Sequence, residues 1–160
     1  MPRIEIRAAT PDDVPLIFAL IGELAAYEKL SHEVVATEQQ IRATLFGDRA
    51  VAEVLIASLD GTPVGFALFF PNYSTFLGRP GLYLEDLYVT PDARGSGAGK
   101  ALLRRLAQIA LEKSCGRFEW SVLDWNEPSI RVYEAIGAEP QKEWVRYRMA
   151  GEKLAAFARG

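Results

Sequence analysis

A glycine-rich stretch from Arg94 to Lys100, reading RGSGAGK, is the part of the sequence best suited to chemistry. It follows LYLEDLYV at 82–89, an apolar and aromatic run typical of a mostly buried strand. After Pro91 the glycines mark the start of a helix. Glycines leave backbone N–H groups uncovered, and the first turn of a helix carries unpaired donors and a partial positive charge. The stretch therefore predicts an anion-binding site, most naturally for a diphosphate.

Two better-known phosphate-binding loops do not fit this stretch. A P-loop requires a first glycine and a hydroxyl residue after its lysine, but Arg94 and Ala101 stand at those positions. The dinucleotide fingerprint is Gly-x-Gly-x-x-Gly, whereas 95–99 reads Gly-x-Gly-x-Gly. The alternative is a glycine-rich helix start that binds nothing. It is disfavoured because three glycines within five residues lose extra backbone entropy on folding.

Few side chains are available for nucleophilic or metal chemistry. The chain has one cysteine, Cys115, and one histidine, His32. A single cysteine excludes an internal disulfide and a cysteine-rich zinc site. A single histidine leaves few residues for a catalytic triad or a histidine metal site. No activating partner stands beside Cys115 in its KSCG setting, so a covalent thioester on it is not expected. We therefore expect carboxylates, tyrosines and backbone groups to act without a metal.

The composition is that of an ordinary globular chain. The 160 residues suit one domain, 1–160, and are 49% hydrophobic and 24% charged. No apolar run approaches the roughly 20 residues that span a bilayer. The N-terminal sequence lacks the apolar region of a signal peptide, so we expect a cytoplasmic protein. A net charge of −3 gives no support for nucleic-acid binding.

Hydrophobic periodicity predicts strands and helices in the order β-α-α-β-β-β-α-β-α-β. Capping boxes at Thr10–Asp13 and Thr37–Gln40 begin the first two helices, Asp60-Gly61 closes a hairpin, and 72–81 is expected to be a loop. The helix after Gly97 implies a right-handed crossover. We expect strands at 3–8, 51–59, 64–70, 82–89, 118–123 and 143–149, and helices from Thr10 to about Leu30, from Thr37 to Gly47, after Gly97, from Asn126 to Gly137 and, as a terminal turn, at 152–157.

Four segments together with the glycine loop resemble one enzyme family. Arg94, Gly97 and Gly99 match the pattern Gln/Arg-x-x-Gly-x-Gly/Ala of the GNAT superfamily of N-acetyltransferases. Within it, the chain is most similar to the diamine (spermidine/spermine) and thialysine N-acetyltransferases, over about residues 3–138. The segments that carry this resemblance are YEKL at 27–30, GFALFF at 65–70, YSTFLGRPGLYLEDLYV at 73–89 and DWNEPSIRVYEAIGA at 124–138.

The resemblance implies a fold and a cosubstrate. The fold is the α/β (α+β) acyl-CoA N-acyltransferase fold, a mixed, mostly antiparallel sheet splayed into a V and flanked by helices. The cosubstrate is acetyl-CoA, no metal is needed, and the protein is expected to be a homodimer. Asn126 and Ser129 could also be simple helix caps. The coenzyme contacts that the resemblance implies are Leu87, Tyr88, Val89, Arg94, Gly95, Ser96, Gly97, Ala98, Gly99, Lys100, Asn126, Glu127, Pro128 and Ser129.

The resemblance also assigns two catalytic side chains. Tyr133 matches the tyrosine that protonates the departing thiolate; by itself it would be read as a core tyrosine beside Ile130 and Ile136. Glu85 matches the glutamate that takes a proton from the amine. A primary amine of pKa about 10.4 is neutral in only about one molecule in two thousand at pH 7, so a base is needed. Alternation along the strand predicts that Asp86 faces the other side, in an interior salt bridge.

The substrate implied is a primary amine with a second positive charge. Tyr27 and Glu28 match substrate positions of the family, and Glu119 and Ser121, on the strand across the gap, are further candidates beside Glu85. Glu28 could equally be a solvated residue at a helix end. Two other functions stay open: acetylation of other amines, such as an amino acid or a protein N-terminus, and an acetyl-CoA-binding module without catalysis.

Overall fold

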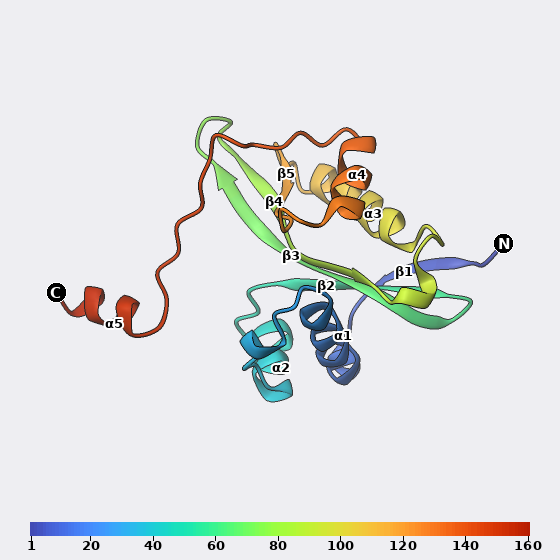
Figure 1. The fold of residues 1–160 in the computed structure, drawn as a ribbon, viewed down its shortest axis with the longest axis horizontal. Helices are drawn as coiled ribbons and strands as arrows, with labels where there is room; N and C mark the ends of the chain where they lie inside the picture. Colours follow the sequence, from blue (N-terminus) through green and yellow to red (C-terminus); the bar gives the residue numbers. More distant parts are fainter. The chain divides into compact units, whose positions relative to one another are not determined.

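This computed structural model describes residues 1–160 and contains two units. The first unit is built on a five-stranded sheet with the strand order β1-β2-β3-β4-β5 (Figure 1). The first unit, Met1–Ser121, contains β1 Ile4–Ala8, α1 Val14–Tyr27, α2 Glu38–Phe46, β2 Glu53–Leu59, β3 Thr62–Ser74, β4 Arg79–Val89, α3 Ala98–Glu112 and β5 Phe118–Trp120. The second, Val122–Gly160, contains α4 Glu127–Ala135 and α5 Gly151–Arg159. That the whole chain acts as one domain stays a prediction.

The sheet is mixed and mostly antiparallel, which confirms the predicted fold class. Strands β1 to β4 pair antiparallel in sequence order, and β5 joins β4 in parallel after the α3 crossover. The β4–β5 ladder joins only Leu82 to Phe118, Tyr83 to Glu119 and Leu84 to Trp120. Strand β4 continues to Val89, so on that side its backbone from residue 85 onward has no strand partner.

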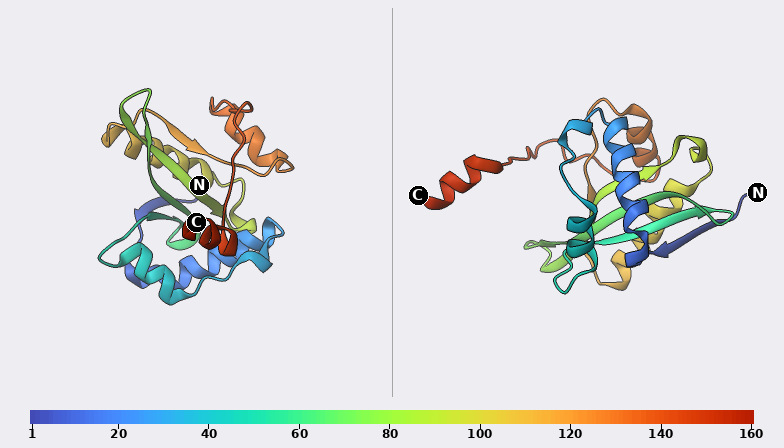
Figure 2. Two further views of the ribbon diagram at one scale, coloured as in Figure 1. Left: turned by 90° about the vertical axis from the view of Figure 1, so that its left-hand side faces the viewer. Right: turned by 90° about the horizontal axis from the view of Figure 1, so that it is seen from below.

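Helices cover both faces of the sheet because strands and helices each bury one apolar side. Helices α1 and α2 lie against one face and α3 against the other (Figures 1 and 2). On α3 the buried side chains recur at helical spacing. The α1–α2 side of the core contains Val14, Ile17, Leu20, Leu24, Ile41, Val54, Ile56, Phe66 and Tyr88.

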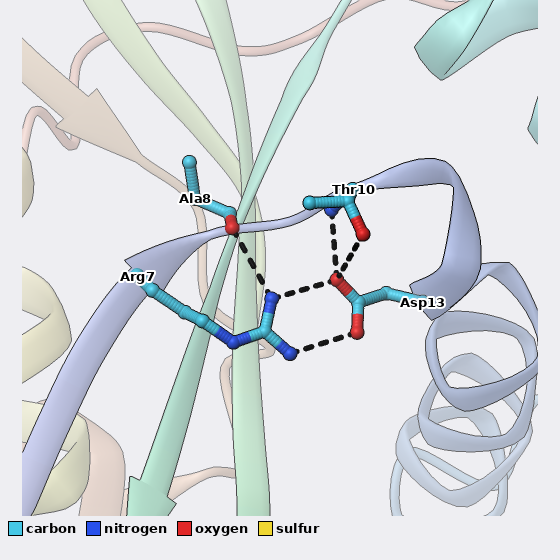
Figure 3. A network of polar contacts seen from close by, with 4 residues as sticks. All are labelled: Arg7, Ala8, Thr10 and Asp13. Atoms are coloured by element: carbon cyan, nitrogen blue, oxygen red, sulfur yellow. Dashed lines mark hydrogen bonds and ion pairs between the residues drawn. The ribbon is translucent and has the colours of Figure 1, made fainter.

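An ion pair joins β1 to the start of α1 (Figure 3). The two Nη atoms of Arg7 donate to the two carboxylate oxygens of Asp13 at 2.7 and 2.8 Å, and the Thr10 amide donates to Asp13 at 2.7 Å. The hydrogen bonds from Arg7, and then the one from the Thr10 amide, lower the pKa of Asp13 to about 2. The predicted capping box is therefore present, but it begins a short 3-10 turn, Pro11–Asp13, that leads into α1.

The hairpin between β3 and β4 is longer than the sequence predicts. The stretch 72–81, expected to be a loop, is mostly strand: the antiparallel ladder continues to Tyr73–Pro80 and Ser74–Arg79. Only 75–78 turn, and Gly78 supplies a left-handed residue with φ 63°. Helix α1 ends at Tyr27 rather than near Leu30, and β5 ends at Trp120 rather than at residue 123.

The strand predicted at 143–149 is absent. A strand requires a partner, and the second unit contains no strand with which this segment could pair. The helical turn expected at 152–157 is part of a longer helix, α5.

No helix has both the length and the apolar character needed to cross a bilayer. The cellular location of the protein stays a prediction.

Candidate functional site

The glycine loop after β4 has the backbone shape that its glycines predict. Gly95 and Gly97 are exposed and left-handed, with φ 81° and 94°, and Gly97 is the N-cap of α3. Residues with a β-carbon rarely adopt this conformation. The loop therefore presents bare backbone at the N-terminus of a 15-residue helix, which favours an anion.

The amides of this loop are only partly available. Those of Arg94, Ser96 and Ala98 donate to the Pro91 carbonyl, the Ala93 carbonyl and the Ser96 hydroxyl, at 3.3, 3.2 and 3.2 Å. The N–H groups of Gly95 and Gly97 have no acceptor within the chain. The amides of Gly99 and Lys100, in the first turn of α3, have no acceptor within the chain either. Four amides are therefore unpaired and their setting fits a diphosphate, while contact of the ligand with the whole stretch from Arg94 to Lys100 stays a prediction.

A β-bulge interrupts β4 next to the point where β5 ends. Leu68 of β3 pairs with Asp86, but the next residue, Phe69, pairs with Leu84, so Glu85 has no partner on β3. A bulge breaks the strict alternation of side chains and re-aims them. The prediction that Glu85 and Asp86 lie on opposite faces depended on that alternation, which the bulge interrupts, so it stays a prediction.

Three carboxylates interact around the bulge. Asp86 is half-buried, and its pKa is raised to about 6, first by burial and then by the negative charges of Glu85 and Glu28. Glu28 directly follows α1, and burial raises its pKa as well. We call Glu28, Glu85 and Asp86 the carboxylate cluster.

No basic side chain neutralises the carboxylate cluster. None of its members takes part in an ion pair, so the prediction of an interior salt bridge at Asp86 is wrong. The cluster also lacks the arrangement of a metal site. Like charges held together away from water disfavour one another, so a positively charged ligand would stabilise this arrangement. Sequence reasoning missed Asp86 because no residue pattern showed the bulge.

Tyr27 and Tyr88 both contact the side chain of Arg94. Its Cζ atom lies 4.8 Å from the centroid of the Tyr27 ring and 5.7 Å from that of Tyr88. The Tyr88 hydroxyl donates to Glu23 at 3.2 Å. Tyr27, the last residue of α1, thus contacts Arg94 of the glycine loop through its ring and directly precedes Glu28 of the carboxylate cluster in the chain.

The two candidates at β5 have partners of their own. Glu119 forms an ion pair with Arg117 at 2.9 Å, and Asn72 donates to it at 3.5 Å. Ser121 lies 2.8 Å, hydroxyl to hydroxyl, from Tyr83. The structure therefore does not group them with the carboxylate cluster as unpaired anchors.

The remaining predicted residues belong to the second unit. The side-chain Oδ1 of Asn126 accepts a hydrogen bond from the Ser129 backbone amide at 3.4 Å, which confirms Asn126 as the N-cap of α4. Glu127 and Pro128 are exposed in the first turn. Tyr133 is half-buried two turns into the helix. Their roles toward a coenzyme stay predictions.

We predict that Asp86→Asn stabilises the fold at neutral pH. The folded pKa of Asp86, about 6, lies above its ordinary 3.8, so its contribution to stability is lost as pH rises from about 4 to about 6. The amide carries no charge, so the free energy of unfolding of the variant should exceed that of the wild type by about 1–3 kcal/mol at pH 7.5. At pH 4 the gain should vanish.

Urea unfolding at both pH values measures this difference. Asp48→Asn, at an exposed carboxylate, is the matched control and should show no such gain. A gain of equal size at pH 4 and pH 7.5 would contradict an electrostatic origin.

Comparison with known proteins identifies the family. Residues 21–138 match the model of the acetyltransferase (GNAT) family. The thialysine N-epsilon-acetyltransferase of Mus musculus is 37% identical, with 99% of each chain covered. The L-ornithine N5-acetyltransferase NATA1 of Arabidopsis thaliana is 36% identical, over 95% of this chain and 86% of that one.

A solved structure agrees with these matches. An integron cassette protein from the mobile metagenome of V. cholerae superposes with a TM-score of 0.81 at 27% identity, over 98% of each chain. The family match covers the glycine loop, the bulged strand and α4. The chain therefore belongs to the GNAT family and is an acetyl-transferring enzyme.

Proposed function

We propose that this enzyme transfers an acetyl group from acetyl-CoA to a primary amine of a small polycationic substrate, a diamine, a polyamine or thialysine, by direct attack in a ternary complex. The observation that carries the proposal is the carboxylate cluster of Glu28, Glu85 and Asp86, which has no cationic partner in the chain. A substrate with two amines supplies one group to react and a second, positive group to pair with a carboxylate.

The names of similar proteins support this substrate class. The substrates named for two of them, thialysine and L-ornithine, both carry a side-chain amine beside further charged groups. A third relative, from Homo sapiens, is named as a spermidine/spermine N(1)-acetyltransferase-like protein. The acetylation of other amines, such as an amino acid or a protein N-terminus, and binding without catalysis are the alternatives. Acetyl-CoA turnover with a panel of amines distinguishes all three.

Bound acetyl-CoA would supply the acetyl thioester. The amides of Gly95, Gly97, Gly99 and Lys100 at the N-terminus of α3 would bind its diphosphate, with Arg94, Ser96 and Ala98 completing the loop. The edge of β4 at Leu87, Tyr88 and Val89 has no strand partner, so its backbone is available to the amide-bearing arm of the coenzyme. The family resemblance implies that residues 126–129 also contact the coenzyme.

Two side chains would transfer protons. Glu85 would take the proton from the ammonium group of the substrate, directly or through a water, because deprotonating it in solution at pH 7 costs about 4–5 kcal/mol. Tyr133 would protonate the departing thiolate. Glu28 and Tyr27, at the end of α1, would bind the distal part of the substrate.

We also propose that the enzyme acts as a homodimer through its C-terminal segment. In the stretch 144–150, which is neither helix nor strand, Val145, Tyr147 and Met149 stand at every second position, and all three are exposed, Tyr147 at 93%. Trp144, Leu154 and Phe157 are exposed too. Six such side chains offer roughly 600–900 Å² per chain, so two copies reach the 1,200–2,000 Å² typical of a stable interface. A second copy of the chain would cover them.

The dimer proposal predicts a specific loss of mass. Wild-type protein should have twice the mass of one chain by light scattering, and Tyr147→Asp should have the mass of a monomer, because a buried unpaired charge opposes association. Arg148→Asp, at the next position and already charged in the wild type, is the control and should remain dimeric. A monomeric wild type would refute the proposal.

For the substrate class, we predict that Glu28→Gln raises KM for a diamine about three- to thirtyfold and changes KM for a matched monoamine little. The reason is that only the diamine has a second charge to pair with Glu28. Steady-state kinetics with both amines measures the split. Glu38→Gln, an exposed carboxylate in the first turn of α2, is the control. Equal effects on both amines would exclude Glu28 as the distal anchor.

For the base, we predict that Glu85→Gln lowers kcat/KM most near pH 7 and progressively less toward pH 10, where free amine becomes plentiful. The expected loss at neutral pH is about 10²–10⁴-fold. The pH profile of kcat/KM is the measurement. A loss that is the same at every pH would show that Glu85 does not act as the base.

A further inference from the structure

The side chain of Arg94 contacts two parts of the molecule that the proposed function uses separately. Arg94 begins the glycine loop, yet its guanidinium lies 4.8 Å from the ring of Tyr27, at the end of α1. Its Nε atom donates to the Val89 carbonyl at 3.2 Å. One side chain thus joins the coenzyme loop, the last residue of β4 and the helix end next to Glu28.

A second connection runs from Arg94 to α1 through Tyr88. The guanidinium lies 5.7 Å from the Tyr88 ring, and the buried Tyr88 donates its hydroxyl to Glu23, one turn before Tyr27. The positive charge of Arg94 partly opposes the raised pKa of the Tyr88 hydroxyl, whose largest cause is burial. Both connections therefore lead from Arg94 to the last turn of α1.

This placement differs from that of a simple phosphate ligand. The Nε–H group already donates to Val89, and the guanidinium carbon lies over two aromatic rings. A cation over an aromatic ring is attracted to its electron-rich face. Any shift of the glycine loop therefore changes the support of Tyr27 and, through the chain, the position of Glu28.

We propose that Arg94 is a positioning residue that couples the coenzyme loop to the end of α1, so that coenzyme binding increases affinity for the amine. The inference rests on the proposed function, because it assumes that the loop binds coenzyme A and that Glu28 binds the amine. Coupling between two sites is reciprocal, so the amine also increases the affinity for the coenzyme. An exposed cation–π contact corresponds to a coupling of about two- to fivefold.

Calorimetry on the full-length protein tests the coupling. Coenzyme A is the probe because it permits amine binding without turnover. In wild type, saturating coenzyme A should tighten the binding of a diamine about two- to fivefold. Arg94→Gln and Tyr27→Leu should each abolish that gain, and the double variant should lose no more than either single one. Arg104→Gln, an exposed arginine on α3, is the control and should keep it.

A second readout does not require an amine at all. Hydrogen exchange of 24–30 should slow when coenzyme A binds to wild type and to Arg104→Gln, but not to Arg94→Gln. Arg94→Lys keeps the charge but loses the planar group, so it should recover only part of the protection. This variant also keeps the experiment interpretable if the neutral variant, Arg94→Gln, does not fold.

The outcomes separate the two proposals. If Arg94→Gln weakens coenzyme binding but keeps full coupling and full protection of 24–30, Arg94 is a phosphate contact only and the inference is wrong. If wild type binds coenzyme A, shows the protection of 24–30 and binds no diamine, the substrate class is wrong while the mechanical coupling stands. If coenzyme A leaves 24–30 of wild type unchanged, the coupling is refuted whatever the substrate.

Discussion

The site depends on the interruption of one strand. Strand β4 pairs with β3 along its length, but it loses β5 after Leu84 and accommodates an extra residue, Glu85, in the β3 ladder at the same point. The first change leaves backbone N–H and C=O groups at one edge unpaired, and the second directs two neighbouring carboxylates away from strict alternation. Backbone groups for an extended ligand and acidic groups for a cation therefore lie in consecutive residues.

Asp13 and Asp86 have opposite electrostatic surroundings. Asp13 is bonded by Arg7 and by a backbone amide, which keep it ionised and stabilise the junction of β1 and α1 (Figure 3). Asp86 is half-buried beside Glu85 and Glu28 without a cation, which disfavours its charge. The ionised form of such a carboxylate lowers the stability of the fold. The contrast separates a residue that holds the fold together from one that a ligand can complete.

Local features of the site were predictable from the sequence because they depend on neighbours along the chain. The capping boxes of Thr10 and Thr37, the Asp60-Gly61 turn and the glycine-rich start of α3 all form as predicted. Features that depend on pairing were less predictable. The loop expected at 72–81 is strand because β3 and β4 support each other there, and the strand expected at 143–149 is absent because no partner strand lies in its unit.

The sequence alone determined the residue types, the glycine loop at the head of a helix and the family to which they belong, because these follow from spacing along one chain. Only the tertiary structure decided which carboxylates act together. Glu28 and Asp86 are 58 positions apart, and the bulge that re-aims Glu85 arises from the register between β3 and β4. Register is a property of two strands at once, so no single stretch of sequence contains it.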